Sequence, residues 1–174
     1  KKAENEIKKL NDELEETVEQ RTSELKKTLH QLEINKDRLE DVLAYQKALF
    51  DNAGAMIVAT DEKGIVKLFN PEAEKNLGYK ESEVINKINT VVFHDKNELN
   101  IKRKNLLDLF GTDITDNFEV IVERAKRHTH VEEQYTYIRK NGTSFPASLT
   151  LTAITDSSRQ IAGYVVVAID ITEK

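Results

Sequence analysis

Residues 55–71 read AMIVATDEKGIVKLFNP, and residues 165–172, near the other end of the chain, read VVVAIDIT. Two apolar runs in the first stretch flank Glu62-Lys63-Gly64, which predicts a tight β-hairpin. The stretch ends at Asn70-Pro71, a typical helix start, because asparagine caps the first turn and proline is tolerated at the first helical position. The second stretch is apolar on both faces of a strand, so we expect it in the middle of a sheet.

The residues between these two stretches predict short helices followed by another hairpin. Asn141-Gly142 between two strand-like segments is a strong hairpin signal, because both residue types tolerate positive φ. Two strands, several helices and three strands predict an α+β domain with helices on one side of an antiparallel sheet. The expected elements are strands over 55–61 and 65–69, helices that start at Asn70 and Glu81 or cover 95–110 and 118–125, and strands over 131–139, 144–154 and 161–171.

The N-terminal part predicts a long helix. Residues 1–53 contain neither glycine nor proline and are rich in Glu, Lys and Leu, as an uninterrupted exposed helix requires. Apolar residues recur in steps of three and four, the pattern of a coiled-coil seam. We therefore divide the chain into a dimeric coiled-coil helix, residues 1–53, and a globular domain, residues 54–174. The predicted seam residues are Leu25, Leu29, Leu32, Leu39, Leu43 and Phe50.

A second seam runs along the same helix. It passes through Val42 and Leu49 and shares Leu25, Leu32 and Leu39 with the first seam. A helix that rotates about its axis would exchange the two seams, whereas a helix that only holds two subunits together needs one. The sequence leaves both interpretations open, a switch and a dimerisation spacer.

The composition argues against several functions. The net charge of −5 and the lack of a basic stripe argue against nucleic acid as a partner, because phosphate neutralisation needs clustered Lys and Arg. The chain has no cysteine, hence no disulfide, no thiolate zinc site and no cysteine nucleophile. We find no Ser-His-Asp arrangement, paired-carboxylate motif or phosphate-binding glycine loop, and expect no enzyme activity within these residues. The apolar runs are too short for a membrane span, and the missing initiator Met leads us to expect a fragment of a longer protein.

A combination of short motifs recurs in order across the globular part: Asp61, Gly64, Asn70-Pro71, Ala73, Gly78-Tyr79, Arg139-Lys140-Asn141-Gly142, Gly163 and Asp170-Ile171-Thr172. This combination resembles the PAS domain with its PAC-type second half, over residues 45–174. The resemblance implies a five-stranded antiparallel sheet in the order 2-1-5-4-3, with short helices around a pocket for a small ligand or cofactor.

The N-terminal helix carries a further resemblance. Residues 18–25 are similar to helices that link HAMP modules to PAS domains. Such an arrangement implies the cytoplasmic part of a membrane-bound receptor, typically a bacterial or archaeal sensor histidine kinase of a two-component system. A HAMP or membrane module would precede the chain, and a kinase or other output domain would follow it.

The resemblance also implies two groups of site residues. Inner-face side chains would line the pocket, although each of them could equally be simple core packing. The candidate pocket residues are Phe69, Phe93, Phe118, Val122, Tyr135, Tyr137, Leu149, Leu151, Tyr164 and Val166. Signal relay would use the end of the last strand, where Asp170 would pair with Arg139 or Lys140, and Ile171 and Thr172 would lead into a following helix.

The sequence does not identify a ligand. Haem-binding PAS domains carry a histidine on the helix before the third strand, whereas His128 and His130 lie beyond the apolar face of that helix here, which disfavours haem. A flavin-cysteinyl adduct is disfavoured because cysteine is absent. His94 and Asp95 are adjacent and point different ways, so we expect a loop or helix cap there and no metal site. The pocket is either occupied or collapsed, and the domain is either a ligand-responsive sensor or a ligand-free dimerisation and relay module.

Overall fold

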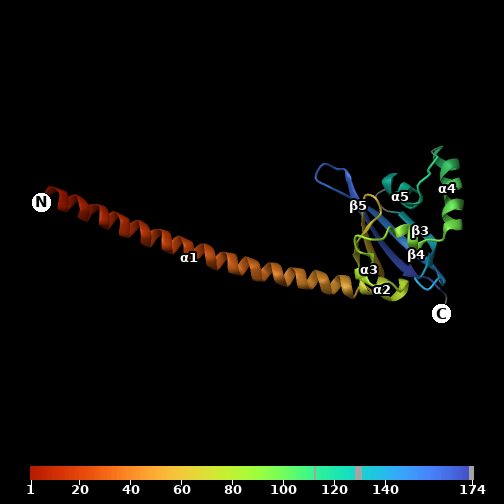
Figure 1. Ribbon diagram of the computed structural model, residues 1–174, viewed down its shortest axis with the longest axis horizontal. Coiled ribbons are helices and arrows are strands. Elements are labelled where there is room, and N and C mark those ends of the chain that lie inside the picture. The colour runs from red at the N-terminus through yellow and green to blue at the C-terminus, as the bar shows by residue number, and fades with distance from the viewer. Residues whose placement is uncertain (112, 128–130, 173–174) are drawn as a thin grey trace. The chain divides into compact units, whose positions relative to one another are not determined.

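The structure is a computed structural model that describes residues 1–111, 113–127 and 131–172 (Figure 1). The chain divides into two compact units, residues 1–48 and residues 49–174. The elements in chain order are α1 (Lys2–Asp51), β1 (Met56–Asp61), β2 (Val66–Phe69), α2 (Pro71–Leu77), α3 (Glu81–Val84), the 3-10 helix η1 (Thr90–Phe93), α4 (Lys96–Phe110), α5 (Asn117–Arg127), β3 (Val131–Ile138), β4 (Ser144–Thr155) and β5 (Ile161–Asp170).

The predicted long helix is confirmed as α1, which has 50 residues and none of them buried. Its sequence favours a helix because strong helix formers fill it without a glycine or proline. Exposed ion pairs such as Lys36–Glu40, at 3.6 Å, add a few tenths of a kcal/mol each. Within the described ranges, no helix combines the length and the apolar character that a membrane span requires.

Five strands form one antiparallel sheet in the predicted order β2-β1-β5-β4-β3. The apolar strand β5 lies between β1 and β4, which confirms its expected central place. Its side chains alternate: Tyr164 and Val166 are buried, whereas Val165 and Val167 on the other face are partly exposed. Such alternation is expected for a sheet that is covered on one face.

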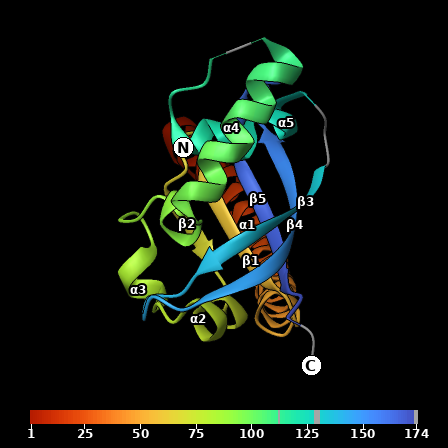
Figure 2. The same cartoon turned by 90° about the vertical axis from the view of Figure 1, so that its right-hand side faces the viewer.

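Short helices cover the inner face of the sheet. In Figure 2, α4 and α5 lie at the upper end of the domain and α2 and α3 at its lower end. The core lies between these helices and the sheet, and the helices contribute buried side chains from Ala73, Leu77, Val84, Leu99, Leu106, Phe118, Ile121 and Val122. Asn70 caps α2 by accepting from the Ala73 amide at 3.0 Å, so the predicted helix start is confirmed.

The three hairpin turns share one conformation, in which the fourth residue of the turn has positive φ. These residues are Gly64 (φ 83°), Gly142 (φ 83°) and Arg159 (φ 62°). The hairpin predicted at Asn141-Gly142 is therefore present. The expectation that both residues have positive φ was wrong for Asn141, because only Gly142 has positive φ. Asn141 acts through its side chain, whose oxygen accepts from the amide of Thr143 at 3.0 Å.

Residues 86–98, which we call the strap, pair with both edges of the sheet. At the β2 edge, the backbone of Val66 exchanges hydrogen bonds of 2.8 and 3.0 Å with residues 86 and 88. At the β3 edge, the Thr136 carbonyl accepts from the Asp95 amide at 3.1 Å. The Thr136 amide donates to Oε2 of Glu98 at 2.6 Å. Because β2 and β3 are the outer strands, the strap crosses the inner face from one edge to the other.

Candidate functional site

The side chains predicted as pocket walls are packed together as the core of the domain. Neighbouring rings meet closely; Phe118 and Tyr164, for example, lie edge to face with centroids 5.6 Å apart. Two small cavities remain among the described residues, each of about 10 Å³, roughly the space that one water molecule needs. The one that His94 lines is called the core cavity below. All ten predicted residues are between 1% and 6% exposed: Phe69, Phe93, Phe118, Val122, Tyr135, Tyr137, Leu149, Leu151, Tyr164 and Val166.

His94 is a polar residue inside this core. It follows η1 directly, and its backbone forms an isolated β-bridge with Tyr137. The residue is 4% exposed, and its ring lies edge to face against Tyr135 and Tyr137, at 4.8 and 4.9 Å. The neighbouring Asp95 caps α4 by accepting from the Glu98 amide at 2.8 Å. The predicted helix cap is thus Asp95, whereas His94 belongs to the core.

The surroundings of His94 keep its ring neutral. Burial, together with the positive charge of Lys102, lowers the pKa of His94 to about 3. A histidine in an unfolded chain has a pKa of about 6.5. Between these two values the unfolded chain binds the proton more readily than the folded domain. The stability of the domain therefore rises with pH across this window and is lost on acidification.

We predict that the free energy of unfolding falls by about 2 kcal/mol between pH 6.5 and pH 5, because one unit of pKa difference corresponds to about 1.4 kcal/mol. Urea unfolding at the two pH values measures the loss. His94→Gln, which lacks the titrating ring, should lose much less, and His30→Gln, at an exposed position of α1, should behave like the wild type. Equal losses in the wild type and in His94→Gln would contradict the assignment.

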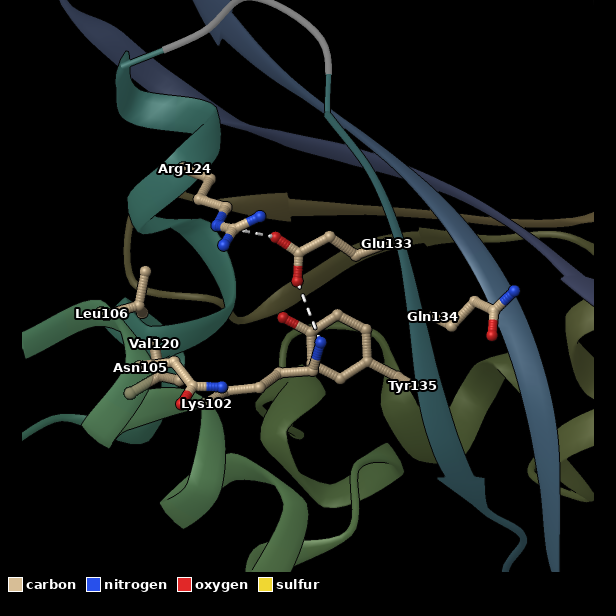
Figure 3. A pocket seen from close by; sticks show the side chains of 8 residues that line it. All are labelled: Lys102, Asn105, Leu106, Val120, Arg124, Glu133, Gln134 and Tyr135. Atoms are coloured by element: carbon tan, nitrogen blue, oxygen red, sulfur yellow. Dashed lines mark hydrogen bonds and ion pairs between the residues drawn. The ribbon is translucent and has the colours of Figure 1, made fainter. Parts of the chain in front are cut away.

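A surface hollow of about 250 Å³ lies between α4, α5 and β3 (Figure 3). Figure 3 shows the Glu133 carboxylate pointing into this hollow, while Gln134 points away from it. Oε2 of Glu133 lies 3.0 Å from Nζ of Lys102, and Oε1 lies 3.3 Å from Nε of Arg124. The lining residues are Lys102, Asn105, Leu106, Val120, Arg124, Glu133, Gln134 and Tyr135.

The charges in this hollow form an internal network. Lys102 also lies 4.0 Å from the centroid of the Tyr135 ring, a cation–π contact. Burial, with the nearby charge of Glu133, raises the pKa of Tyr135, so its phenol stays protonated at neutral pH. An anionic ligand would have to displace Glu133 from both cations. The arrangement therefore fastens α4 and α5 to β3.

The predicted relay residues meet near the end of β5. Nη2 of Arg139 lies 3.2 Å from Oδ2 of Asp170, and its guanidinium lies 3.9 Å from the centroid of the Phe145 ring. Lys140, the other basic residue considered for this contact, instead places Nζ 2.6 Å from Glu83. Of the two alternatives, the structure thus pairs Arg139 with Asp170.

Asp170 also fixes the residues that follow β5. Its Oδ1 accepts from the amide and the hydroxyl of Thr172, at 2.9 and 2.6 Å. Burial alone would raise the pKa of Asp170, but the hydrogen bonds from Thr172 and the charge of Arg139 outweigh burial and lower it. The amide of Ile171 donates to the Pro146 carbonyl at 3.0 Å. These contacts set the direction in which the chain leaves the last strand.

Five of the six predicted seam residues of α1 expose their side chains in this single chain. Leu25, Leu29, Leu32, Leu39 and Leu43 are between 53% and 60% exposed. Phe50, the sixth predicted seam residue, belongs to the second unit and is partly buried. Its carbonyl accepts from Nδ2 of Asn70 at 3.1 Å. His128 and His130, weighed above as haem ligands, lie outside the described residues.

Two residues have a larger structural role than the sequence predicted. Asn70 was identified as a helix cap, but it also bonds to the backbone of Phe50, Ala55 and Ile57. His94 was expected in a loop or cap. The apolar run Val91-Val92-Phe93 directly before it was the signal that could have indicated burial.

Comparison with known proteins agrees with this architecture. The family description "PAS domain" matches residues 53–173. The fold is similar to the PAS domain of an HTR-like protein from Haloarcula marismortui, with 20% identity, a TM-score of 0.58 and coverage of 79% of this chain and 98% of that chain. The PAS domain of a protein from Colwellia psychrerythraea is also similar, with 17% identity, a TM-score of 0.57 and coverage of 76% of this chain and 99% of that chain.

A PAS domain from a two-component sensor histidine kinase is also similar, at 13% identity, with a TM-score of 0.54 and coverage of 75% of this chain and 97% of that chain. No curated protein matches the chain. At these identities the solved structures show a shared fold and nothing finer.

Proposed function

The chain belongs to the PAS domain family, and on that premise we propose that it is a sensory and relay module of a signal-transduction receptor. The observation that carries this proposal is the position of the two ends of the domain. Met56, at the start of β1, is the register partner of Ala168, near the end of β5. A surface hollow of about 380 Å³ is lined from both ends, by residues 54–56 and 168–170. A displacement at one end can reach the other through backbone hydrogen bonds of neighbouring strands.

The receptor in this proposal is a membrane-bound sensor histidine kinase, with the present chain in its cytoplasmic part. The similarity of residues 18–25 to HAMP-linking helices and the fold shared with a sensor-kinase PAS domain support it. In this proposal a HAMP or membrane module lies upstream of α1, and a kinase or other output domain lies downstream of Lys174. Catalysis belongs to that output domain and not to this chain, and nucleic acid is not a partner.

We further propose that α1 forms a parallel homodimer through its leucine seam. We predict that Leu32→Asp combined with Leu39→Asp weakens dimerisation at least about 100-fold, because each leucine loses about 1.5–3 kcal/mol of apolar burial. Both residues belong to both seams. Sedimentation equilibrium over a concentration series measures the change.

The matched control is Gln31→Asp combined with Ala44→Asp, which adds the same charge at exposed positions outside the seams. This variant should remain dimeric. Equal dissociation of both double variants would mean that added charge, and not the seam, explains the effect.

The relay proposal predicts that the end of β5 and the seam of α1 respond to each other, since coupling between two sites is reciprocal. Single cysteines at Val42 and Leu43 report the two seams, and the chain contains no native cysteine to interfere. We expect Arg139→Ala, which removes the contact to Asp170, to change the ratio of disulfide crosslinking at the two positions at least about two-fold. Lys140→Ala is the control, because Lys140 pairs with Glu83 instead.

A ligand-free dimerisation and relay module is the second candidate function. The small core cavity, about 10 Å³, favours it. A metabolite, haem or flavin that raises the melting temperature would favour the sensor instead, because a compound that binds the folded state stabilises it. An unchanged crosslinking ratio in Arg139→Ala would remove the relay role from both candidates and leave only dimerisation.

A further inference from the structure

The ring of His94 carries an unpaired polar atom. Among the described residues, the buried side-chain atoms without a hydrogen-bond partner are Nδ1 of His94 and Nε of Arg103. Arg103 bonds through its other nitrogens to Asn100 and Thr115. Few such atoms occur in native proteins, because an unpaired buried polar atom costs about 1–3 kcal/mol. Nδ1 of His94 therefore indicates a partner other than the described side chains.

His94 lines the core cavity of about 10 Å³, so a partner molecule has a place next to the ring. A buried water forms two to four hydrogen bonds and needs about 10–15 Å³. Besides His94, four hydroxyl-bearing residues line the cavity, and one of them, Thr60, already donates its hydroxyl to the Asp61 carbonyl at 2.9 Å. The four are Thr60, Thr90, Tyr137 and Tyr164, and the remaining walls are apolar.

The charge distribution around the ring selects against ions. Burial and Lys102 keep His94 neutral, and the same lysine would repel a cation. An anion in the cavity would lose its hydration without gaining a charged partner, since Lys102 is paired with Glu133 at 3.0 Å. A neutral molecule meets neither penalty.

We propose that the cavity beside His94 is a binding site for one small uncharged molecule that hydrogen-bonds to Nδ1. Water occupies the site in the absence of a ligand, and a small alcohol or amide replaces the water when it binds. The proposal rests on the sensory function proposed above, since it names the class of ligand to which the PAS core responds. An occupant larger than water has to move the strap, because Thr90, Phe93 and His94 all belong to the strap and line the cavity. A ligand larger than water would thereby change the hydrogen bonds that the strap forms with Val66 and Thr136 at the two edges of the sheet.

Side-chain nitrogen NMR of the whole chain, labelled with ¹⁵N, tests the proposal. We expect the Nδ1 resonance of a hydrogen-bonded, neutral imidazole and a cross-peak between the His94 ring and a bound water. Methanol and formamide are the probes, and each should shift the His94 signals saturably and remove the water cross-peak. Xenon, which has no hydrogen-bonding group, should leave Nδ1 without a partner.

His94→Phe removes the anchor and should abolish the effect of both probes, and His30→Phe, at an exposed position, should leave it unchanged. If His94→Phe does not fold, Thr90→Val tests the same wall with a nearly isosteric change and should weaken probe binding at least about three-fold. An Nδ1 resonance without a hydrogen bond overturns the proposal. A water that neither probe displaces also overturns it, because that water is then purely structural. The crosslinking ratio in Arg139→Ala needs no ligand, so it tests the relay separately.

Discussion

Gly163→Ala is expected to destabilise the domain by about 3 kcal/mol or more, because the added methyl group has no room in the middle of the sheet. Gly163 on β5 faces Asp61 on β1 and Ile154 on β4. A Cβ at this position would overlap the carbonyl oxygen of Thr60 and lie 3.2 Å from its carbonyl carbon. These are backbone atoms of a paired strand, so relief requires β1 and β5 to separate.

Urea unfolding of the wild type and of two glycine variants measures this effect. Gly111→Ala is the control: Gly111 has φ of 66°, and a Cβ there would meet no heavy atom within 4 Å. That variant should lose only about 1–2 kcal/mol, the cost of a left-handed conformation with a side chain. Similar losses in both variants would argue that overlap with Thr60 is not the cause.

Asn70→Ala is expected to have the second large effect, a loss of about 3–5 kcal/mol, because it leaves several buried backbone groups without partners. Asn70 is 0% exposed. Its Oδ1 accepts from the amides of Ile57 and Ala73, at 2.9 and 3.0 Å. Its Nδ2 donates to the carbonyls of Phe50 and Ala55, at 3.1 and 2.9 Å. One amide side chain thus joins the residues before β1, β1 itself and α2.

Asn89 provides a matched control for this substitution. It caps η1 by accepting from the Val91 amide at 3.0 Å and donates to the Lys63 carbonyl at 2.7 Å, but its side chain is more exposed. Asn89→Ala should cost about 1 kcal/mol, the usual loss of a helix cap. Asn70→Asp keeps the acceptor and loses the donor, so it should lower the free energy of unfolding by more than Asn89→Ala does. Equal losses at the two asparagines would contradict the role assigned to Asn70.

Most element boundaries could be predicted because local signals determine them. Asn70-Pro71 starts α2, and Asn141-Gly142 joins β3 to β4. Both signals are local and do not depend on contacts with distant segments. The alternation of buried and exposed residues along β4 follows the period of two that the sequence shows. The resemblance to the PAS domain then supplied the strand order, which no local signal specifies.

The site could be predicted only in part, because it depends on contacts between distant segments. The sequence supplied the core side chains but not the volume that remains between them. It left Arg139 and Lys140 as equal partners for Asp170, and the choice depends on Glu83, which lies far from both in the chain. His94 was missed because its burial comes from Tyr135 and Tyr137 on β3, which the strap reaches only after folding.

The strap has a consequence for the behaviour of the protein in a crowded cell. Exposed outer strands are templates on which a strand from another molecule can add, and such addition leads to aggregation or to capture of extended peptides. Here the outward backbone groups of Val66 and Thr136 are already hydrogen-bonded to residues 86–98. At these positions an incoming strand finds no donor or acceptor to bind. The strap therefore protects these two positions of the outer strands against the addition of a foreign strand.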